Sequence, residues 1–362
     1  DSSAASDVYK RQDMDFKMHF LPGKPLEQNS HKSIGLQTMY QGSINNHFIT
    51  VGVDLEMTEG ELNEFQTAPD VSFGPRLAYP NGDHYDYNVE SKIIAAFVNF
   101  EWNLTEKTKL VTGIRGEKVD YEYETNITPG IKGRIQVAPN RNDDFTEFSP
   151  KLAINHKIND DLAIFANFSR GNRAPQTTDL YRIQSKQIPG GAKSEKLDSF
   201  EIGLRGNFSI FNLELVGFDM QKENYFFRDS QGFNVENGKT THRGFEVSFL
   251  IDFNQFFQIE NSTSFAEHEY DFDHSPNGIK SGNQIDSAPE LLANTRLIFM
   301  PKERTRIELE WEKIDSYPVD ERNAHFYQGH DVFNLRTKMP INENISIGIY
   351  INNITDKSYA NL

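Results

Sequence analysis

Apolar and polar residues alternate along most of this chain. In Ile345–Asn353, four isoleucines (Ile345, Ile347, Ile349 and Ile351) occupy every second position, with Ser, Gly, Tyr and Asn between them. Ser199–Gly206, Gly244–Ile251 and Thr305–Trp311 alternate in the same way, and the pattern recurs in about 15 segments. A period of two is typical of strands with two unlike faces. The sequence therefore predicts a chain made almost entirely of strands.

The connections between these segments are alternately short and long. Seven short polar turns are predicted, at Gly42–Asn45, Leu104–Lys107, Asn159–Asp161, Asn207–Ile210, Asp252–Gln255, Pro301–Arg304 and Ile341–Asn344. Seven long loops lie between them, at Leu21–Ser33, Thr58–Glu90, Glu124–Phe145, Gly171–Glu195, Arg228–Lys239, Glu267–Glu290 and Ile314–His330. In an antiparallel meander every second connection falls at the same end. The sequence thus predicts tight turns at one rim and long loops at the other, as in a bacterial outer-membrane barrel.

The polar positions of the predicted strands carry charge, at Glu201, Arg205, Glu246, Glu308 and Glu310. In a membrane barrel such a face lines a wet lumen and the apolar face meets lipid. A soluble sandwich also alternates, with its polar face in bulk water. The number of segments favours the barrel, because one sandwich domain uses about 7–9 strands. We therefore predict that the five charged residues face a lumen and that the four isoleucines face lipid.

Composition narrows the possible functions. The net charge of −16 and the pI of about 5.1 argue against nucleic-acid binding, which needs clustered Lys and Arg. Mean hydropathy is −0.63, and no apolar run reaches the ~18 residues of a transmembrane helix. The chain has no cysteine, which fits passage through an oxidising periplasm. No phosphate-binding loop, nucleophile elbow or zinc-protease motif is present, so an enzyme is the least favoured class.

The pattern is continuous, so one domain is predicted over residues 13–362. Asp1–Gln12 (DSSAASDVYKRQ) shows no strand alternation and resembles translated vector sequence. We interpret it as a non-native or disordered leader.

Five strings together resemble the barrel of the TonB-dependent receptor family. Ser149–Arg182 (SPKLAINHKINDDLAIFANFSRGNRAPQTTDLYR) contains the family's "SP-x-L" and "RAP" elements, with Asn172 where an aromatic is usual. The other strings are VTGIRGE from Val111, EKLDSFEIGLRG from Glu195, GKTTHRGFEVSF from Gly238 and IYINNITDKSY from Ile349. They occur in the family's order, on the predicted strands. The clear resemblance covers Ser91–Leu362.

The resemblance implies an all-β, antiparallel, up-and-down transmembrane barrel in the Gram-negative outer membrane, with about 15 of the 22 strands of a complete member. A plug domain, a TonB box and the final strand are then expected outside this chain. The implied function is energised uptake of a scarce nutrient, most often an iron–siderophore complex. The implied partners are outer-membrane lipid, the TonB energising complex and a small-molecule ligand such as a ferric siderophore. A receptor for haem, cobalamin or glycans, a passive substrate-specific porin, and a soluble all-β binding protein stay open as alternatives.

No catalytic residue, metal ligand or cofactor is predicted. The loop Gly171–Glu195 offers the candidate ligand-binding residues, which are Arg173, Tyr181, Arg182 and Gln184. Arg pairs with anions in a bidentate way and Tyr stacks on catechol-like rings, although a solvated loop explains the same residues. His268 and His274 flank two aspartates without a known ligand spacing, so we expect a solvated acidic loop there. Glu64 is likewise expected to be a solvated loop charge.

Overall fold

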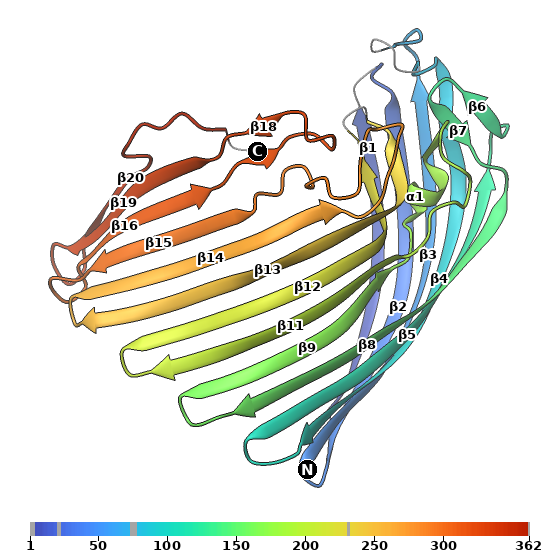
Figure 1. The fold of residues 1–362 in the computed structure, drawn as a ribbon. Coiled ribbons are helices and arrows are strands. Elements are labelled where there is room, and N and C mark those ends of the chain that lie inside the picture. The colour runs from blue at the N-terminus through green and yellow to red at the C-terminus, as the bar shows by residue number, and fades with distance from the viewer. Residues whose placement is uncertain (1–3, 20–22, 73–77, 230–231, 361–362) are drawn as a thin grey trace.

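A single curved antiparallel sheet of fifteen strands dominates the computed structural model (Figure 1). The structure describes residues 4–19, 23–72, 78–229 and 232–360. The strands of the main sheet are β1 (Ala4–His19), β2 (Leu26–Ile44), β3 (His47–Gln66), β4 (Gly82–Asn103), β5 (Thr108–Thr125), β8 (Arg141–Lys157), β9 (Leu162–Arg173), β11 (Glu195–Phe208), β12 (Phe211–Arg228), β13 (Asn234–Asn254), β14 (Phe257–Tyr270), β15 (Leu291–Phe299), β16 (Arg306–Ile314), β19 (His330–Pro340) and β20 (Ser346–Ile351). Each strand pairs with the next in this order, which confirms the predicted meander.

Smaller elements lie in the long connections. Strands β6 (Gly130–Lys132), β7 (Ile135–Val137) and β10 (Ile183–Gln184) form a three-stranded sheet. Strands β17 (Tyr317–Pro318) and β18 (Phe326–Tyr327) form a two-stranded ribbon. Helix α1 (Thr177–Tyr181) lies between β9 and β10. Among the described residues, no helix is long and apolar enough to cross a membrane.

The predicted sidedness is confirmed. All seven predicted short turns lie between paired strands at one rim, and the long connections lie at the other rim (Figure 1). Most of the seven long loops are shorter than predicted, because the strands extend into them. The largest extensions are at the start of β2 (Leu26), the end of β3 (Gln66) and the starts of β4 (Gly82), β8 (Arg141) and β13 (Asn234). Glu59, Glu61 and Glu64 lie in the segment predicted as a loop, but β3 continues through them as a strand.

Residues 4–12, within the predicted leader, lie in a strand. Ala4–Gln12 belongs to β1, which pairs with β2 in continuous register from Ala4↔Gln41 to His19↔Leu26. Backbone pairing with a long neighbour is sufficient to hold a segment extended without side-chain alternation. The proposed domain boundary at residue 13 stays a prediction.

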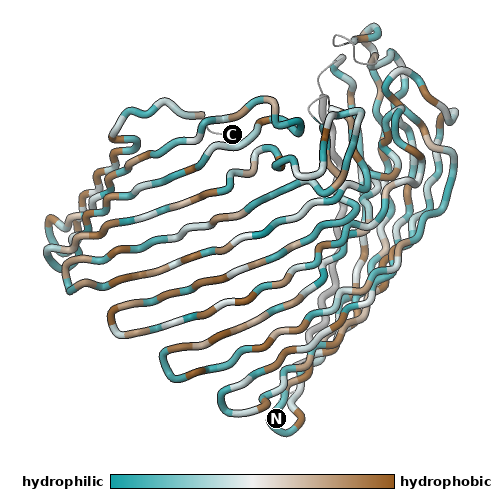
Figure 2. The backbone as a smooth tube through the Cα atoms, viewed as in Figure 1, coloured by the Kyte–Doolittle hydropathy of each residue, from teal (hydrophilic) through white to brown (hydrophobic). Residues whose placement is uncertain are grey.

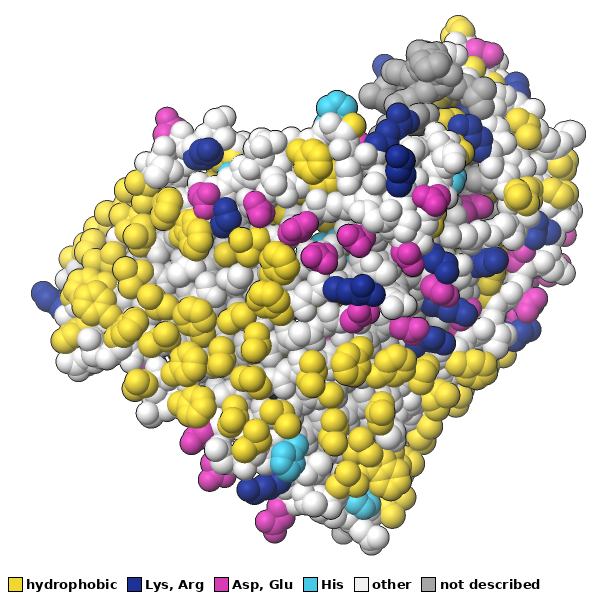
Figure 3. All heavy atoms as spheres, viewed as in Figure 1, with side chains coloured by type: hydrophobic (Ala, Val, Ile, Leu, Met, Phe, Trp, Pro, Cys, Tyr) yellow, Lys and Arg dark blue, Asp and Glu magenta, His cyan; other side chains and the backbone are white. Residues whose placement is uncertain are grey.

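Two faces of the sheet carry different side chains. We call the face that α1 packs against the inner face and the opposite one the outer face. Large apolar residues are exposed on the outer face, among them Ile94, Ile114, Phe148, Phe200, Ile202 and Phe245. Figure 2 shows hydrophobic and hydrophilic positions alternating along the strands, and Figure 3 shows a hydrophobic belt bordered by charged side chains. Such a belt matches the lipid-facing band of a membrane barrel.

The buried apolar cluster lies on the inner face near the long loops. Leu180 of α1 and Ile183 of β10 pack there with Leu62 of β3 and the tyrosines Tyr85 and Tyr87 of β4. This cluster fixes the loop between β9 and β11 to the wall of the sheet. The sheet itself has two edge strands, since β1 and β20 each have one neighbour in the described part of the chain.

Candidate functional site

The loop between β9 and β11 folds inward instead of extending into solvent. Its helix α1 begins after Gln176, whose backbone N–H donates to the Asp179 carboxylate over 3.0 Å. Such a bond satisfies one of the free N–H groups at a helix start. Tyr181 at the end of α1 is fully buried and donates its hydroxyl to Asp143 of β8 over 2.9 Å. Burial and this carboxylate raise the pKa of the Tyr181 hydroxyl.

Two long loops are joined by backbone pairing. Strand β10 adds to the β6–β7 hairpin through Ile183↔Gln136 and Gln184↔Ile135. The hydroxyl of Tyr85 donates to the Ile183 carbonyl over 2.6 Å, which links this small sheet to β4. The residues on either side of these two pairs, such as Arg134 and Arg182, are therefore held at fixed positions above the inner face.

A cavity of about 410 Å³ lies between these loops and the ends of β3, β4 and β12. Its lining residues are Pro25, Glu64, Tyr79, Tyr85, Arg134, Ile135, Thr178, Asp179, Arg182, Gln184, Phe226, Phe227, Arg228 and Asn234. Three arginines, two tyrosines and two phenylalanines thus surround one space with two carboxylates. We take this cavity as the candidate binding site.

Arg182 lines the cavity and is held in place by ion pairs. Its guanidinium lies 2.8 Å from the Glu27 carboxylate and also contacts Glu64. Burial lowers the pKa of Arg182, but the Glu64 and Glu27 carboxylates raise it by a larger amount. The pKa of Arg182 therefore lies above its ordinary value. Glu64 also bonds to His84 over 2.8 Å and is 3% exposed, so the expectation of a solvated charge was wrong. The strand extension of β3 places this residue on the inner face.

The other two arginines of the cavity differ in their burial and in their contacts. Arg134 is buried, and its guanidinium lies 4.1 Å from the ring centroid of Phe233 and 5.4 Å from that of Tyr79. Arg228, at the end of β12, is exposed and makes no ion pair within the described residues. It is therefore the cation of this cavity that a ligand can reach with the least rearrangement.

The four loop residues predicted from sequence divide into two pairs. Arg182 and Gln184 line the cavity. Arg173 instead pairs with Glu195 at 2.9 Å and with Asp179 at 3.7 Å, and Tyr181 lies inside the apolar cluster. Their contact with a ligand stays a prediction. The sequence analysis missed Arg134, Arg228 and the aromatic residues, because they come from segments far from the loop in sequence.

The five charged residues predicted to face a lumen lie on the inner face. Glu308 and Glu310 belong to an ionic network across β15, β16 and β19, with Arg296 and Arg336 2.7–3.0 Å from Glu310 at their nearest atoms. Arg205 pairs with Glu214 at 2.9 Å, while Glu201 and Glu246 are more exposed than Glu310. Their alternation with Phe200, Ile202 and Phe245 on the outer face follows from the strand period.

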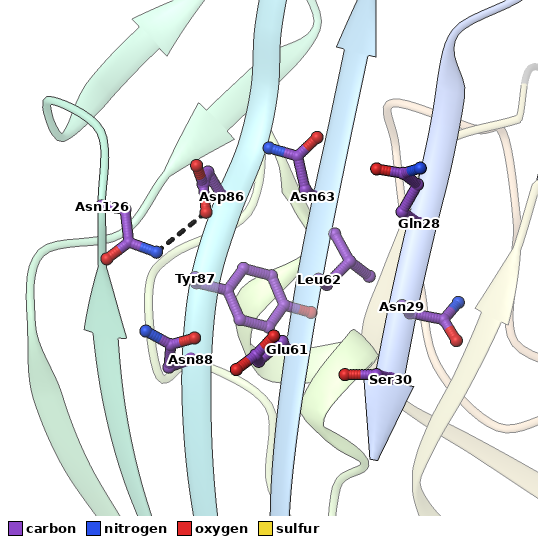
Figure 4. Close-up of a pocket in the computed structure, with 10 residues that line it drawn as sticks. All are labelled: Gln28, Asn29, Ser30, Glu61, Leu62, Asn63, Asp86, Tyr87, Asn88 and Asn126. Atoms are coloured by element: carbon purple, nitrogen blue, oxygen red, sulfur yellow. Dashed lines mark hydrogen bonds between the residues drawn. The ribbon is translucent and has the colours of Figure 1, made fainter. Parts of the chain in front are cut away.

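A second hollow, of about 580 Å³, is lined by β2, β3, β4 and Asn126 (Figure 4). Leu62 and Tyr87 belong to the inner cluster, so their strand neighbours Glu61, Asn63 and Asp86 point to the outer face. Asn126 donates to Asp86 over 2.8 Å. Its described lining residues are rich in amides and include no cation, so they do not suit an anionic ligand.

Among the described residues, no group of three or more His, Cys, Asp or Glu is arranged to hold a metal ion. His268 does not pair with His274, whose backbone instead bonds to Ile279 over 3.0 Å.

The comparisons with known proteins identify the architecture. A family model described as "TonB dependent receptor-like, beta-barrel" matches residues 3–354. Among solved structures, the copper transporter OprC is similar over 99% of this chain and 57% of its own, with 14% identity and a TM-score of 0.77. The ferric yersiniabactin uptake receptor of Yersinia pestis shares 14% identity over 98% and 54% of the two chains, with a TM-score of 0.72. The ferric citrate transporter FecA shares 16% identity over 99% and 54%, with a TM-score of 0.70.

These likenesses, all below 25% identity, concern the fold. The chain spans a little over half the length of each of these solved structures. No curated protein matches it significantly.

Proposed function

Because this chain belongs to the TonB-dependent receptor family through its β-barrel, we propose that the whole protein is a receptor for energised uptake of a ferric siderophore. The chain is an outer-membrane protein of a transport-receptor family. Several of its structural neighbours are uptake receptors for ferric chelates, which supports this ligand class.

The observation that carries the proposal is the arginine-lined cavity at the long-loop end. Arg134, Arg182 and Arg228 come from three separate segments and converge on one space. A planar guanidinium binds carboxylate or catecholate oxygens through paired hydrogen bonds, and the neighbouring aromatic rings can pack on a ligand ring. A metal chelate with anionic oxygens and aromatic groups fits this lining.

The carboxylates of the cavity neutralise Arg182 but form no ion pair with Arg228 within the described residues. Glu64 is already paired with Arg182 and His84. Burial raises the pKa of Asp179, although Arg173 and the Gln176 N–H act in the opposite direction. The exposed Arg228 therefore has no carboxylate partner within the described residues and is available to an anion.

The rim position of the cavity matches a receptor that takes its ligand from outside the cell. The long loops of an outer-membrane barrel are extracellular. Binding here would precede transport, which in this family draws energy from the inner membrane through the TonB complex. That partner is part of the proposal.

Uptake assays in a deletion strain test the ligand class. Cells complemented with the wild-type gene would be given radiolabelled iron on a panel of siderophores, and also haem, cobalamin and oligosaccharides. Arg228→Gln removes the exposed cation, and Arg243→Gln is the matched control, because Arg243 pairs with Asp219 on the outer face. We expect at least a tenfold loss of affinity for one ferric siderophore in Arg228→Gln and wild-type affinity in Arg243→Gln.

Each result decides between ligand classes. Loss of glycan, cobalamin or haem uptake, with every siderophore unaffected by gene deletion, would replace the ligand and keep the receptor. Equal ligand affinities in Arg228→Gln and Arg243→Gln would show that Arg228 of the cavity does not bind the ligand.

A further inference from the structure

Two histidines face each other on the inner wall, away from the arginine-lined cavity. His242 of β13 and His268 of β14 are directly opposed in the strand register. Their Nδ1 atoms lie 2.8 Å apart, and their rings are tilted at 59° with centroids 5.0 Å apart. Both side chains are partly buried. The strand pairing therefore holds two imidazole nitrogens at a fixed short separation.

The protonation of this pair is constrained by the contact itself. One Nδ1 must donate and the other must accept, so at least one imidazole is neutral. The Nε2 atom of His242 lies 2.9 Å from the hydroxyl of Thr240. If both rings carry their proton on Nε2, His242 can donate to Thr240 and both Nδ1 lone pairs point into the space between the rings. No proton has to leave the protein for this change of tautomer.

The separation suits two ligands of one metal ion. Imidazole nitrogens bind first-row metal ions at about 2.0–2.1 Å, so two of them at the right angle of a tetragonal site lie about 2.9 Å apart. The hydrogen bond between His242 and the Thr240 hydroxyl would orient the His242 ring, as outer-shell partners of metal-bound histidines do. The observed 2.8 Å between the Nδ1 atoms is close to this geometry.

A third donor lies in the same cross-strand row. Met220 of β12 is directly opposite His242 in the register, on the same face of the sheet. Directly opposed side chains have Cβ atoms about 4.5–5.5 Å apart, which is within reach of a flexible thioether. The nearby cation Lys222 is held by Glu195, with 3.3 Å between its Nζ and the carboxylate. The row thus combines two imidazoles and one soft sulfur.

We propose that His242, His268 and Met220 form a binding site for copper on the inner wall. Among divalent first-row metals, copper binds imidazole ligands most strongly, and a thioether favours its reduced form. A cross-strand pair 26 positions apart has no local spacing signal, which is why sequence analysis did not find it. The proposal is independent of the siderophore assignment, because neither histidine lines the arginine cavity.

Copper binding to the complete protein, purified in detergent, tests the site. The variants are His242→Ala and His268→Ala, and the control is His325→Ala, whose side chain is 80% exposed and pairs with Asp320 in a distant loop. The probe is Cu²⁺ alone, with stoichiometry from elemental analysis and ligands from electron paramagnetic resonance. We expect one copper per chain with coupling to two nitrogens, and at least a tenfold weaker affinity in either alanine variant.

Thr240→Val provides a second variant that keeps all three proposed ligands. It should weaken copper binding by about 10- to 100-fold, as loss of an outer-shell bond does, and leave the two-nitrogen signal in place. Wild-type protein that holds no stoichiometric copper, or equal affinity in His242→Ala, His268→Ala and His325→Ala, would overturn the proposal. The pair would then be a hydrogen bond only.

Discussion

The ring of Tyr181 stacks on the ring of Tyr123, with centroids 4.3 Å apart and planes 15° apart. This contact joins the helix of a long loop to the inner wall at β5. It gives Tyr181 a structural position inside the apolar cluster, where the sequence had made it a candidate for ligand contact. The loop that shapes the arginine cavity therefore depends on an aromatic contact outside the cavity.

Removing the Tyr181 ring should release the loop. Tyr181→Ala deletes the stack and leaves a cavity, at a cost of about 3–5 kcal/mol to the docked loop. Tyr181→Phe keeps the stack and loses the bond to Asp143, at a cost of about 1 kcal/mol. Limited proteolysis between residues 174 and 194 should be much faster in the alanine variant. Equal cleavage of the two variants would contradict the role of the stack.

The outer belt predicts an asymmetric response to charge on neighbouring positions of β11. Ile202 is exposed on the outer face, and Glu201 lies on the inner face. Ile202→Arg should destabilise the complete protein in lipid by about 2–4 kcal/mol if it lies near the midplane, and Glu201→Arg should cost much less. Denaturant titration in vesicles measures both. The same test applies to Ile349→Arg in β20. Equal costs at 201 and 202 would reverse the facing assignment.

The ionic network on β16 has one central carboxylate. The Glu310 side chain is 1% exposed and accepts hydrogen bonds from Asn294, Arg296 and Asn334. Glu310→Ala would leave two half-exposed guanidiniums without their nearest counter-charge, at a cost of roughly 3 kcal/mol. Glu246→Ala is the control, because Glu246 is exposed and has no ion pair within the described residues. The thermal midpoint should fall clearly in the first variant and little in the second.

The loop between β16 and β19 should lose order in acid. Burial raises the pKa of Asp320, but hydrogen bonds from the backbone N–H of Ala324, the His325 ring and two more N–H groups lower it below its ordinary value of about 3.9. The ionised Asp320 carboxylate thus stabilises the loop at pH values above its ordinary pKa. This stability is lost as the pH falls through the lowered pKa.

Hydrogen exchange of the 322–325 amides, corrected for intrinsic rate, should show lower protection in acid than at pH 7. Asp320→Asn should lower the protection at pH 7 and remove most of its pH dependence. Protection that stays constant with pH in the wild-type chain would contradict this account.

Much of the fold was predictable because a strand period is a local signal. The alternation in Ser199–Gly206 predicted both the strand β11 and the opposite faces of Phe200 and Glu201. Around Leu297 and Ile298 the sequence does not distinguish the two faces, because Leu297 and Phe299 alternate with Ile298 and Met300 and both sets are apolar. Leu297 is exposed on the outer face and Ile298 is fully buried on the inner face. That burial depends on tertiary contacts that no local pattern records.

The site was only partly predictable. Arg182 and Gln184 could be chosen because they follow a family-like string in one loop. Arg134 and Arg228 reach the same cavity from other loops, through the pairing of β10 with β7 and the length of β12. Such convergence depends on how the folded chain brings distant segments together. Composition and residue spacing do not record this.

The central claim is that the complete protein is an energised receptor, and one uptake measurement tests it most directly. Radioiron bound to its siderophore would be followed in cells with and without the inner-membrane energising complex. The account predicts that surface binding persists in both strains and that accumulation inside the cell is lost without the complex. Accumulation that continues at the wild-type rate without the complex would contradict it, and the passive porin would replace the receptor.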